Sequence, residues 1–103
     1  QLNLPNHGLI PNLPAGAIVE VPGLVSALGV RGLNMPPLPE AIAELCRREL
    51  ALSSLTVDAC VHGDRQLALQ ALLLDPMVND IDTARAILED FVDAFAQYLP
   101  QFA

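Results

Sequence analysis

A chain of 103 residues is long enough for one domain, and a hydrophobic fraction of 52% allows a real core. Twelve acidic residues against five arginines give a net charge of −7. This charge argues against a nucleic acid or an anionic membrane surface as a partner, because both require a basic face. The chain has no run of 18 apolar residues, which argues against a transmembrane helix, and its start lacks the pattern of a signal peptide.

The first fourteen residues, QLNLPNHGLIPNLP, predict an extended loop, because their prolines exclude a helix. Asn6-His7-Gly8 is typical of a turn, and Asn12-Leu13-Pro14 is typical of an extended segment. A rigid polar loop of this kind is a usual place for ligand contacts. The alternative is an ordinary surface connection without a ligand.

Residues 16–33 change to a β-branched composition and predict strands. We expect a long broken strand at about 17–28, a turn near Gly29 and a short strand at 30–34. Pro22 should lie at an edge or a bulge, because it cannot donate to a strand ladder. Alternation along the strand predicts that Glu20 faces solvent.

The residues after Pro39 predict a long helix over Glu40–His62, with Glu44 and Arg48 forming a favourable i,i+4 pair. Cys46 and Cys60 lie fourteen residues apart on this helix. A rise of roughly 21 Å over that interval is too long for a disulfide. We therefore expect two buried thiols in a reducing compartment, which favours the cytoplasm.

A leucine-rich helix is predicted between Gly63 and Pro76. Gly63 suits the position after a helix end, Asp64 suits an N-cap, and Asp75-Pro76 ends the helix. The segment is apolar on nearly all sides, which is typical of a central packing helix. A last helix is expected to begin at Asp80 or Asp82 and to run to about Leu99.

No metal or catalytic site follows from the residues themselves. His7, His62 and the two cysteines match no zinc-binding spacing. Glu89 and Asp93 form an acidic i,i+4 pair on the last helix, which on an exposed face indicates a solvated surface. The predicted fold class is α+β: an N-terminal extended loop and a β-hairpin, followed by three helices.

Taken in order, several phrases of the chain resemble the C-terminal region of glycoside hydrolase family four, the NAD- and manganese-dependent α-glucosidases, α-galactosidases, α-galacturonidases and 6-phospho-glycosidases. The phrases are Asn6-x-Gly8-x-Ile10-x-Asn12-Leu13-Pro14, Val19-Glu20-Val21-Pro22, Pro37-Leu38-Pro39, Gly63-Asp64-Arg65-x-Leu67-Ala68-Leu69-Gln70-Ala71-Leu72, Leu74-Asp75-Pro76 and Tyr98-Leu99-Pro100-Gln101-Phe102. They span essentially all 103 residues.

The resemblance implies a C-terminal domain like that of lactate and malate dehydrogenases, within an enzyme that hydrolyses O-glycosidic bonds. In that family NAD oxidises C3 of the sugar, Mn2+ stabilises the enediolate, and the leaving group is eliminated. The chain has no GxGxxG-like loop, and the family's metal-binding Cys and His cannot be carried onto its own cysteines and histidines. Residues 1–103 are therefore expected to be the C-terminal piece without the dinucleotide-binding part, with no NAD or Mn2+ bound and no activity alone.

What this piece would contribute is part of the sugar-pocket wall and contacts between subunits. The candidate substrate-binding residues are Asn6, His7, Gly8 and Asn12, in the first loop. Surplus apolar surface predicts a homo-oligomer, with the leucine-rich helix or the strand region at the interface. The alternative is a non-catalytic helical oligomerisation or interaction domain.

Overall fold

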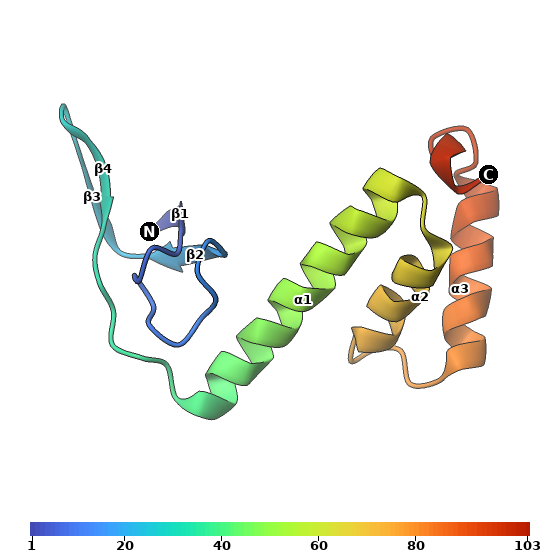
Figure 1. The fold of residues 1–103 in the computed structure, drawn as a ribbon, viewed down its shortest axis with the longest axis horizontal. Coiled ribbons are helices and arrows are strands. Elements are labelled where there is room, and N and C mark those ends of the chain that lie inside the picture. The colour runs from blue at the N-terminus through green and yellow to red at the C-terminus, as the bar shows by residue number, and fades with distance from the viewer. The chain divides into compact units, whose positions relative to one another are not determined.

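Two compact units, Gln1–Arg47 and Arg48–Ala103, make up the chain in a computed structural model that describes all 103 residues. The first unit opens with a two-stranded antiparallel sheet of β1 (Leu2–Pro5) and β2 (Ile18–Val21), in which Leu2 lies opposite Val21 (Figure 1). The sequence predicted only a loop at β1. The alternation of Leu2 and Leu4 with polar residues was the available signal.

A second antiparallel hairpin follows, made of β3 (Gly23–Ser26) and β4 (Gly29–Gly32). The broken strand expected over 17–28 is thus observed as two strands, β2 and β3, which belong to different sheets. The ladder breaks at Pro22, which has no N–H to donate and whose carbonyl oxygen instead accepts from the Leu33 amide at 2.8 Å. The chain reverses at Ala27-Leu28, just before the expected Gly29, whereas the exposed position predicted for Glu20 is confirmed.

The core of the first unit lies under the β1–β2 sheet and the loop that joins its strands. Ile10, Val19 and Val21 are buried, and Val21 has no exposed surface. Half-buried side chains from the loop and from the segment before the first helix complete the cluster: Leu4, Leu9, Leu13, Met35 and Leu38. Burial of these side chains holds the connecting loop against the sheet.

Helix α1 (Glu40–His62) has the bounds that the sequence predicted, and the division between the units falls within it. The expected Glu44–Arg48 pair is wrong. Glu44 pairs with Arg47 at 3.0 Å, and Arg48 instead donates to the Leu74 carbonyl oxygen at 2.9 Å. That carbonyl belongs to the last turn of the next helix, where carbonyls lack partners within the helix.

The cysteines on α1 also differ from expectation. Both are free, but Cys46 is only half-buried and Cys60 is exposed. The description of two buried thiols is therefore wrong. The fully buried residues of this helix are Ala43 and Ala59.

Helix α2 (Arg65–Leu74) and helix α3 (Ile81–Ala94) lie against each other in the second unit (Figure 1). The Asp64 carboxylate accepts from the Gln66 and Leu67 amides at 2.8 and 3.1 Å, so the predicted N-cap is confirmed. Gly63 has a φ of +65°, the left-handed conformation that is typical of the residue following a helix end.

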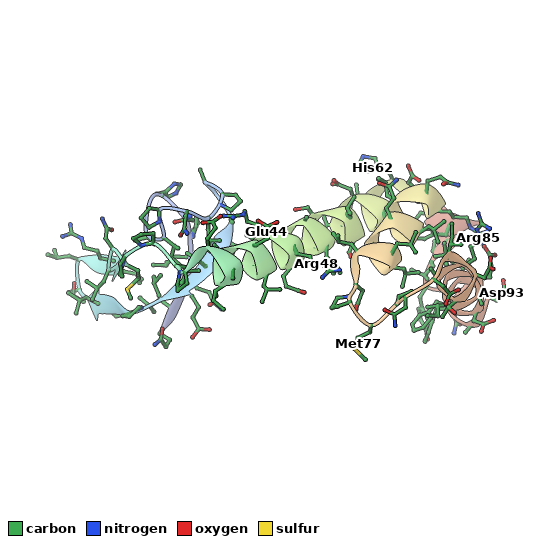
Figure 2. The ribbon with its side chains drawn as sticks, turned by 90° about the horizontal axis from the view of Figure 1, so that it is seen from below. Glu44, Arg48, His62, Met77, Arg85 and Asp93 are labelled. Atoms are coloured by element: carbon green, nitrogen blue, oxygen red, sulfur yellow. The ribbon has the colours of Figure 1, made fainter.

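Asp80 is the N-cap of α3, one of the two residues expected there. Its carboxylate accepts from the Thr83 amide at 2.8 Å and from the Thr83 hydroxyl at 2.5 Å. These hydrogen bonds lower the pKa of Asp80, because they favour the ionised carboxylate. Outward-facing Arg85 and Asp93 mark the solvated side of this helix (Figure 2).

The last helix is shorter than expected, because it ends at Ala94 and not near Leu99. The Leu99 amide donates back to Phe95 and Ala96, and a 3-10 turn, η1 (Pro100–Phe102), follows. This reversal brings Phe102 into the core of the second unit, beside Ala59 and Val92. The free energy gained by burying the Phe102 ring exceeds the free energy lost by ending the helix early.

Only Ala71 is fully buried on α2, and its leucines are half-buried or, at Leu73, exposed, so this chain leaves part of the helix's apolar surface uncovered. The architecture as a whole, a small α+β fold with two hairpins and then three helices, agrees with the predicted class. No helix combines the length and the apolar character that a bilayer crossing requires.

Candidate functional site

The loop between β1 and β2 is organised by the Asn6 side chain, which is only 1% exposed. Its amide nitrogen donates to the carbonyl oxygens of Ile10, Leu13 and Pro14 at 2.9, 3.0 and 3.2 Å. Its Oδ1 accepts from the Ile10 amide at 2.9 Å. The side chain therefore replaces the backbone partners that an irregular buried loop lacks.

Asn12 ties the same loop to the start of α1. Its side chain donates to the Leu38 carbonyl at 2.8 Å and accepts from the Leu38 amide at 2.9 Å. Arg47 donates to the Asn12 carbonyl oxygen at 2.7 Å and also pairs with Glu40. The hydrogen bond and charge of Arg47 lower the pKa of Glu40, with a further contribution from Asn12.

His7 and Gly8 differ from the two asparagines because they lie at the surface. Gly8 has a φ of +86°, and nothing lies within 4 Å of the place where a Cβ would stand. The loop thus has one titratable side chain exposed to solvent, that of His7. Hydrogen bonds of Asn6 and Asn12 fix the backbone that carries it.

Sequence reasoning missed Arg47 as a member of this loop network. The signal was present in the spacing of Glu40, Glu44 and Arg47, which places the three side chains on one side of the helix. The contact with the Asn12 carbonyl could not be foreseen, because it joins residues 35 positions apart.

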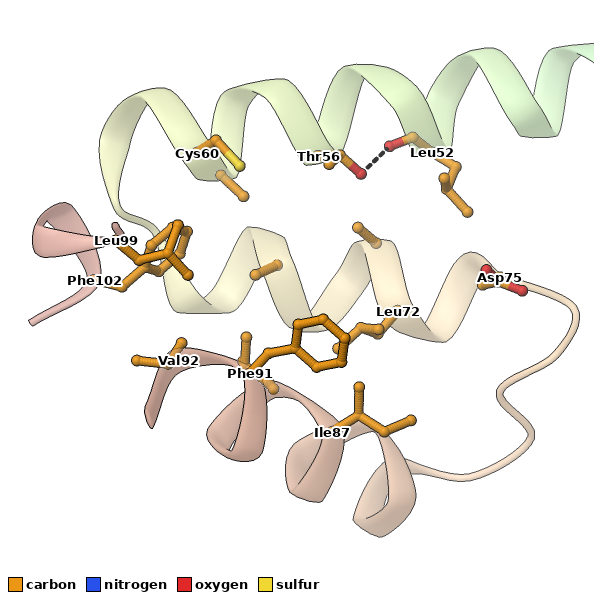
Figure 3. Close-up of a pocket in the computed structure, with 14 residues that line it drawn as sticks. Leu52, Thr56, Cys60, Leu72, Asp75, Ile87, Phe91, Val92, Leu99 and Phe102 are labelled. Carbon is orange, nitrogen blue, oxygen red and sulfur yellow. Dashed lines mark hydrogen bonds between the residues drawn. The ribbon is translucent and has the colours of Figure 1, made fainter. Parts of the chain in front are cut away.

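A second concave feature lies within the helical unit, an apolar cavity of about 360 Å3 between the second half of α1, α2 and α3 (Figure 3). Its lining includes Leu52 of α1, Leu72 of α2, and Ile87 and Phe91 of α3 (Figure 3). Thr56 lies on its wall, but its hydroxyl is bonded to the Leu52 carbonyl at 2.9 Å. The cavity therefore offers shape and apolar contact, with little polar chemistry.

The residues present do not form a metal or dinucleotide site among themselves. No three His, Cys, Asp or Glu side chains come together in a group that could hold a metal ion. The sequence contains no glycine-rich phosphate loop either. The side chains of residues 1–103 therefore do not by themselves fit a metal ion or a nicotinamide cofactor.

Comparison with solved structures defines the class of fold. The chain superposes with a TM-score of 0.88 on a 6-phospho-alpha-glucosidase from gut microorganisms, solved with NAD and glucose-6-phosphate, at 30% identity over 98% of this chain and 23% of that one. It superposes with a TM-score of 0.85 on a 6-phospho-beta glucosidase from Thermotoga maritima, at 29% identity over 94% of this chain and 24% of that one.

Sequence comparison points to the same class. The model of the family 4 glycosyl hydrolase C-terminal domain matches residues 1–78, and the chain belongs to this family. An alpha-galactosidase of Rhizobium meliloti (strain 1021) is 38% identical over 106 residues, which cover 100% of this chain and 22% of that protein. A phospho-alpha-glucosidase of Clostridium acetobutylicum is 38% identical over 93 residues, covering 90% of this chain and 21% of that protein.

Proposed function

We propose that this chain is the C-terminal part of an NAD- and Mn2+-dependent glycosidase that hydrolyses α-glucosides, α-galactosides or α-uronides by redox elimination. The observation that carries the proposal is the family match over residues 1–78, which includes the whole first loop. Relatives solved with NAD and with Mn2+ support the two cofactors. The chain spans about a fifth to a quarter of the length of the relatives that it matches.

Within that enzyme, the proposed role of the chain is to form part of the sugar-pocket wall. The loop that carries Asn6, His7, Gly8 and Asn12 supports this role, because a rigid backbone with an exposed imidazole can present donors and acceptors to sugar hydroxyls. Asn6 and Asn12 act on the shape of the loop, and His7 and Gly8 face the sugar.

Activity of the 103-residue chain gives the first test. We expect no release of p-nitrophenol from p-nitrophenyl α-glycosides in the presence of NAD, Mn2+ and a reductant, because the chain has no dinucleotide loop and no metal-binding cluster. The complete enzyme, expressed from the whole reading frame, is the positive control. Turnover by the short chain well above a buffer blank would refute the proposal that this chain lacks the catalytic part of the enzyme.

A substitution at His7 in the complete enzyme tests the pocket wall. We expect His7→Ala to raise KM for the glycoside about tenfold while kcat changes less, since a lost contact to the sugar weakens ground-state binding. His62→Ala is the matched control, because His62 is an exposed histidine on α1 that bonds only to the Asp58 carbonyl. Equal KM values for His7→Ala and wild type would show that His7 does not contact the sugar.

A second candidate function, a non-catalytic helical oligomerisation domain, is favoured by the exposed apolar side chains of the chain. The reading frame before Gln1 separates the two. A dinucleotide loop followed by Asn-Pro and by a metal-binding Cys and His would support the enzyme; an unrelated domain would support the alternative. Both proposals include self-association, and the free thiols favour the cytoplasm for either.

A further inference from the structure

The loop between β1 and β2 has no charged side chain of its own. Residues 1–39 contain only Glu20 and Arg31 among charged side chains, so the whole net charge of −7 belongs to the rest of the chain. The charges that reach the loop come from the start of α1, where Arg47 donates to the Asn12 carbonyl oxygen at 2.7 Å. No backbone amide donates to that oxygen, so the guanidinium supplies the partner that this half-buried carbonyl needs.

The Arg47 guanidinium is held in place by two carboxylates, which lie about one and two turns earlier on α1. Its Nε donates to Glu44 at 3.0 Å, and a second nitrogen pairs with Glu40. The Arg47 side chain is 29% exposed, whereas those of Glu40 and Glu44 are 74% and 73% exposed. Ion pairs to carboxylates this exposed add little stability. Their effect is to orient the planar guanidinium, which can then bond three acceptors at once.

Two asparagines connect this guanidinium with His7. Arg47 fixes the backbone of Asn12, and the next residue, Leu13, accepts from the buried Asn6 side chain at 3.0 Å. Asn6 directly precedes His7 in the chain. All of these residues belong to the first unit. The exposed imidazole therefore lies at the end of a hydrogen-bonded path that begins on a helix.

We propose that Arg47 is a positioning residue for sugar binding: it holds the loop against the start of α1, so that His7 meets the sugar at a fixed place. The guanidinium itself does not contact the sugar, because its donors are already bonded to Asn12, Glu40 and Glu44. A helix supports a binding residue more precisely than a loop does. The inference rests on the contact between His7 and the sugar in the proposed function, and it adds the residue that fixes this contact.

Kinetics of the complete enzyme on a p-nitrophenyl α-glycoside test the assignment. We expect Arg47→Met to raise KM about fivefold and to change kcat less than about twofold, because ground-state binding is weakened. In the double variant, KM should rise no further than in His7→Ala alone, since a residue that acts through His7 has no effect once the imidazole is gone. Increases in KM that multiply would show that Arg47 acts independently of His7, and would overturn the proposal.

A matched control and a second variant sharpen this test. Arg85 also pairs with an acid three residues earlier, but it points outward from α3 (Figure 2), so Arg85→Met should leave KM unchanged. Arg47→Lys keeps a positive charge between the two acids of α1. We expect its KM to stay about threefold above wild type, because an ammonium group cannot reproduce the planar fork of the guanidinium. A wild-type KM in Arg47→Lys would contradict the proposal.

Hydrogen exchange of the complete enzyme, followed by mass spectrometry without substrate, separates this inference from the proposed function. Peptides from residues 6–17 should exchange on the order of 10-fold faster in Arg47→Met than in wild type, while peptides from α2 should not change. Unchanged exchange of the loop would overturn the positioning role, whatever the kinetics. If the loop exchanges faster but His7→Ala keeps the wild-type KM, the function proposed for the loop fails, whereas the anchoring of the loop by Arg47 is upheld.

Discussion

Asn6→Ala is expected to loosen the first unit more than any other single change in the loop. The substitution leaves the Ile10 amide and the Leu13 carbonyl oxygen without a partner, while the Ile10 and Pro14 carbonyl oxygens keep the Leu13 and Ala17 amides. A buried polar group left unpaired costs about 1–3 kcal/mol, and water entering the cavity would recover part of the total. We therefore expect the free energy of opening to fall by roughly 3 kcal/mol.

Amide hydrogen exchange followed by NMR measures this loss of stability residue by residue within the first unit. The amides of β2 and the Ile10 amide should exchange on the order of 100-fold faster than in wild type. Asn3→Ala is the matched control, because Asn3 lies exposed on β1 and its side chain forms no hydrogen bond. Unchanged protection of β2 in Asn6→Ala would show that the loop does not depend on this side chain.

Gly63→Ala is expected to have the largest effect on the helical unit. A Cβ at Gly63 would stand 1.8 Å from the Gln101 carbonyl oxygen, and the φ of +65° is itself unfavourable for alanine. To relieve the contact, η1 must move away and take the buried Phe102 ring with it. Strain and lost packing together should lower the free energy of unfolding by about 3 kcal/mol.

Urea unfolding followed by the helical circular dichroism signal measures this change. Gly63→Asn separates the two causes, because asparagine tolerates a positive φ far better than alanine but still carries a Cβ. We expect Gly63→Asn to be nearly as unstable as Gly63→Ala. If Gly63→Asn behaved like wild type, backbone conformation alone would explain the glycine, and the contact with Gln101 would be unimportant.

The features that the sequence predicted correctly are those with local causes. The bounds of α1 follow from Pro39 and Gly63, and the caps of α2 and α3 follow from Asp64 and Asp80. Each of these signals acts within one turn of helix, so no distant contact could change it. The family was also recognisable, because its motifs are short phrases in a fixed order.

The candidate site was predicted only as a stretch of loop. Asn6, Gly8 and Asn12 carry the resemblance and His7 lies between two of them, but the sequence could not say which of the four face inward. The structure separates two asparagines bonded to the backbone from His7 and Gly8 at the surface. That difference depends on the folding of the loop around Asn6.

The sequence by itself determined the family, the α+β class, the helix starts and the uneven distribution of charge, since these depend on residue identity and nearest neighbours. Only the tertiary structure decided that β2 pairs with β1 rather than continuing into β3, and that α3 stops at Ala94. It alone also decided that Arg47, and not Arg48, pairs with Glu44. Each of these outcomes is set by a competition between a local preference and a contact made with a distant part of the chain, and burial or hydrogen bonding of the distant partner is what prevails.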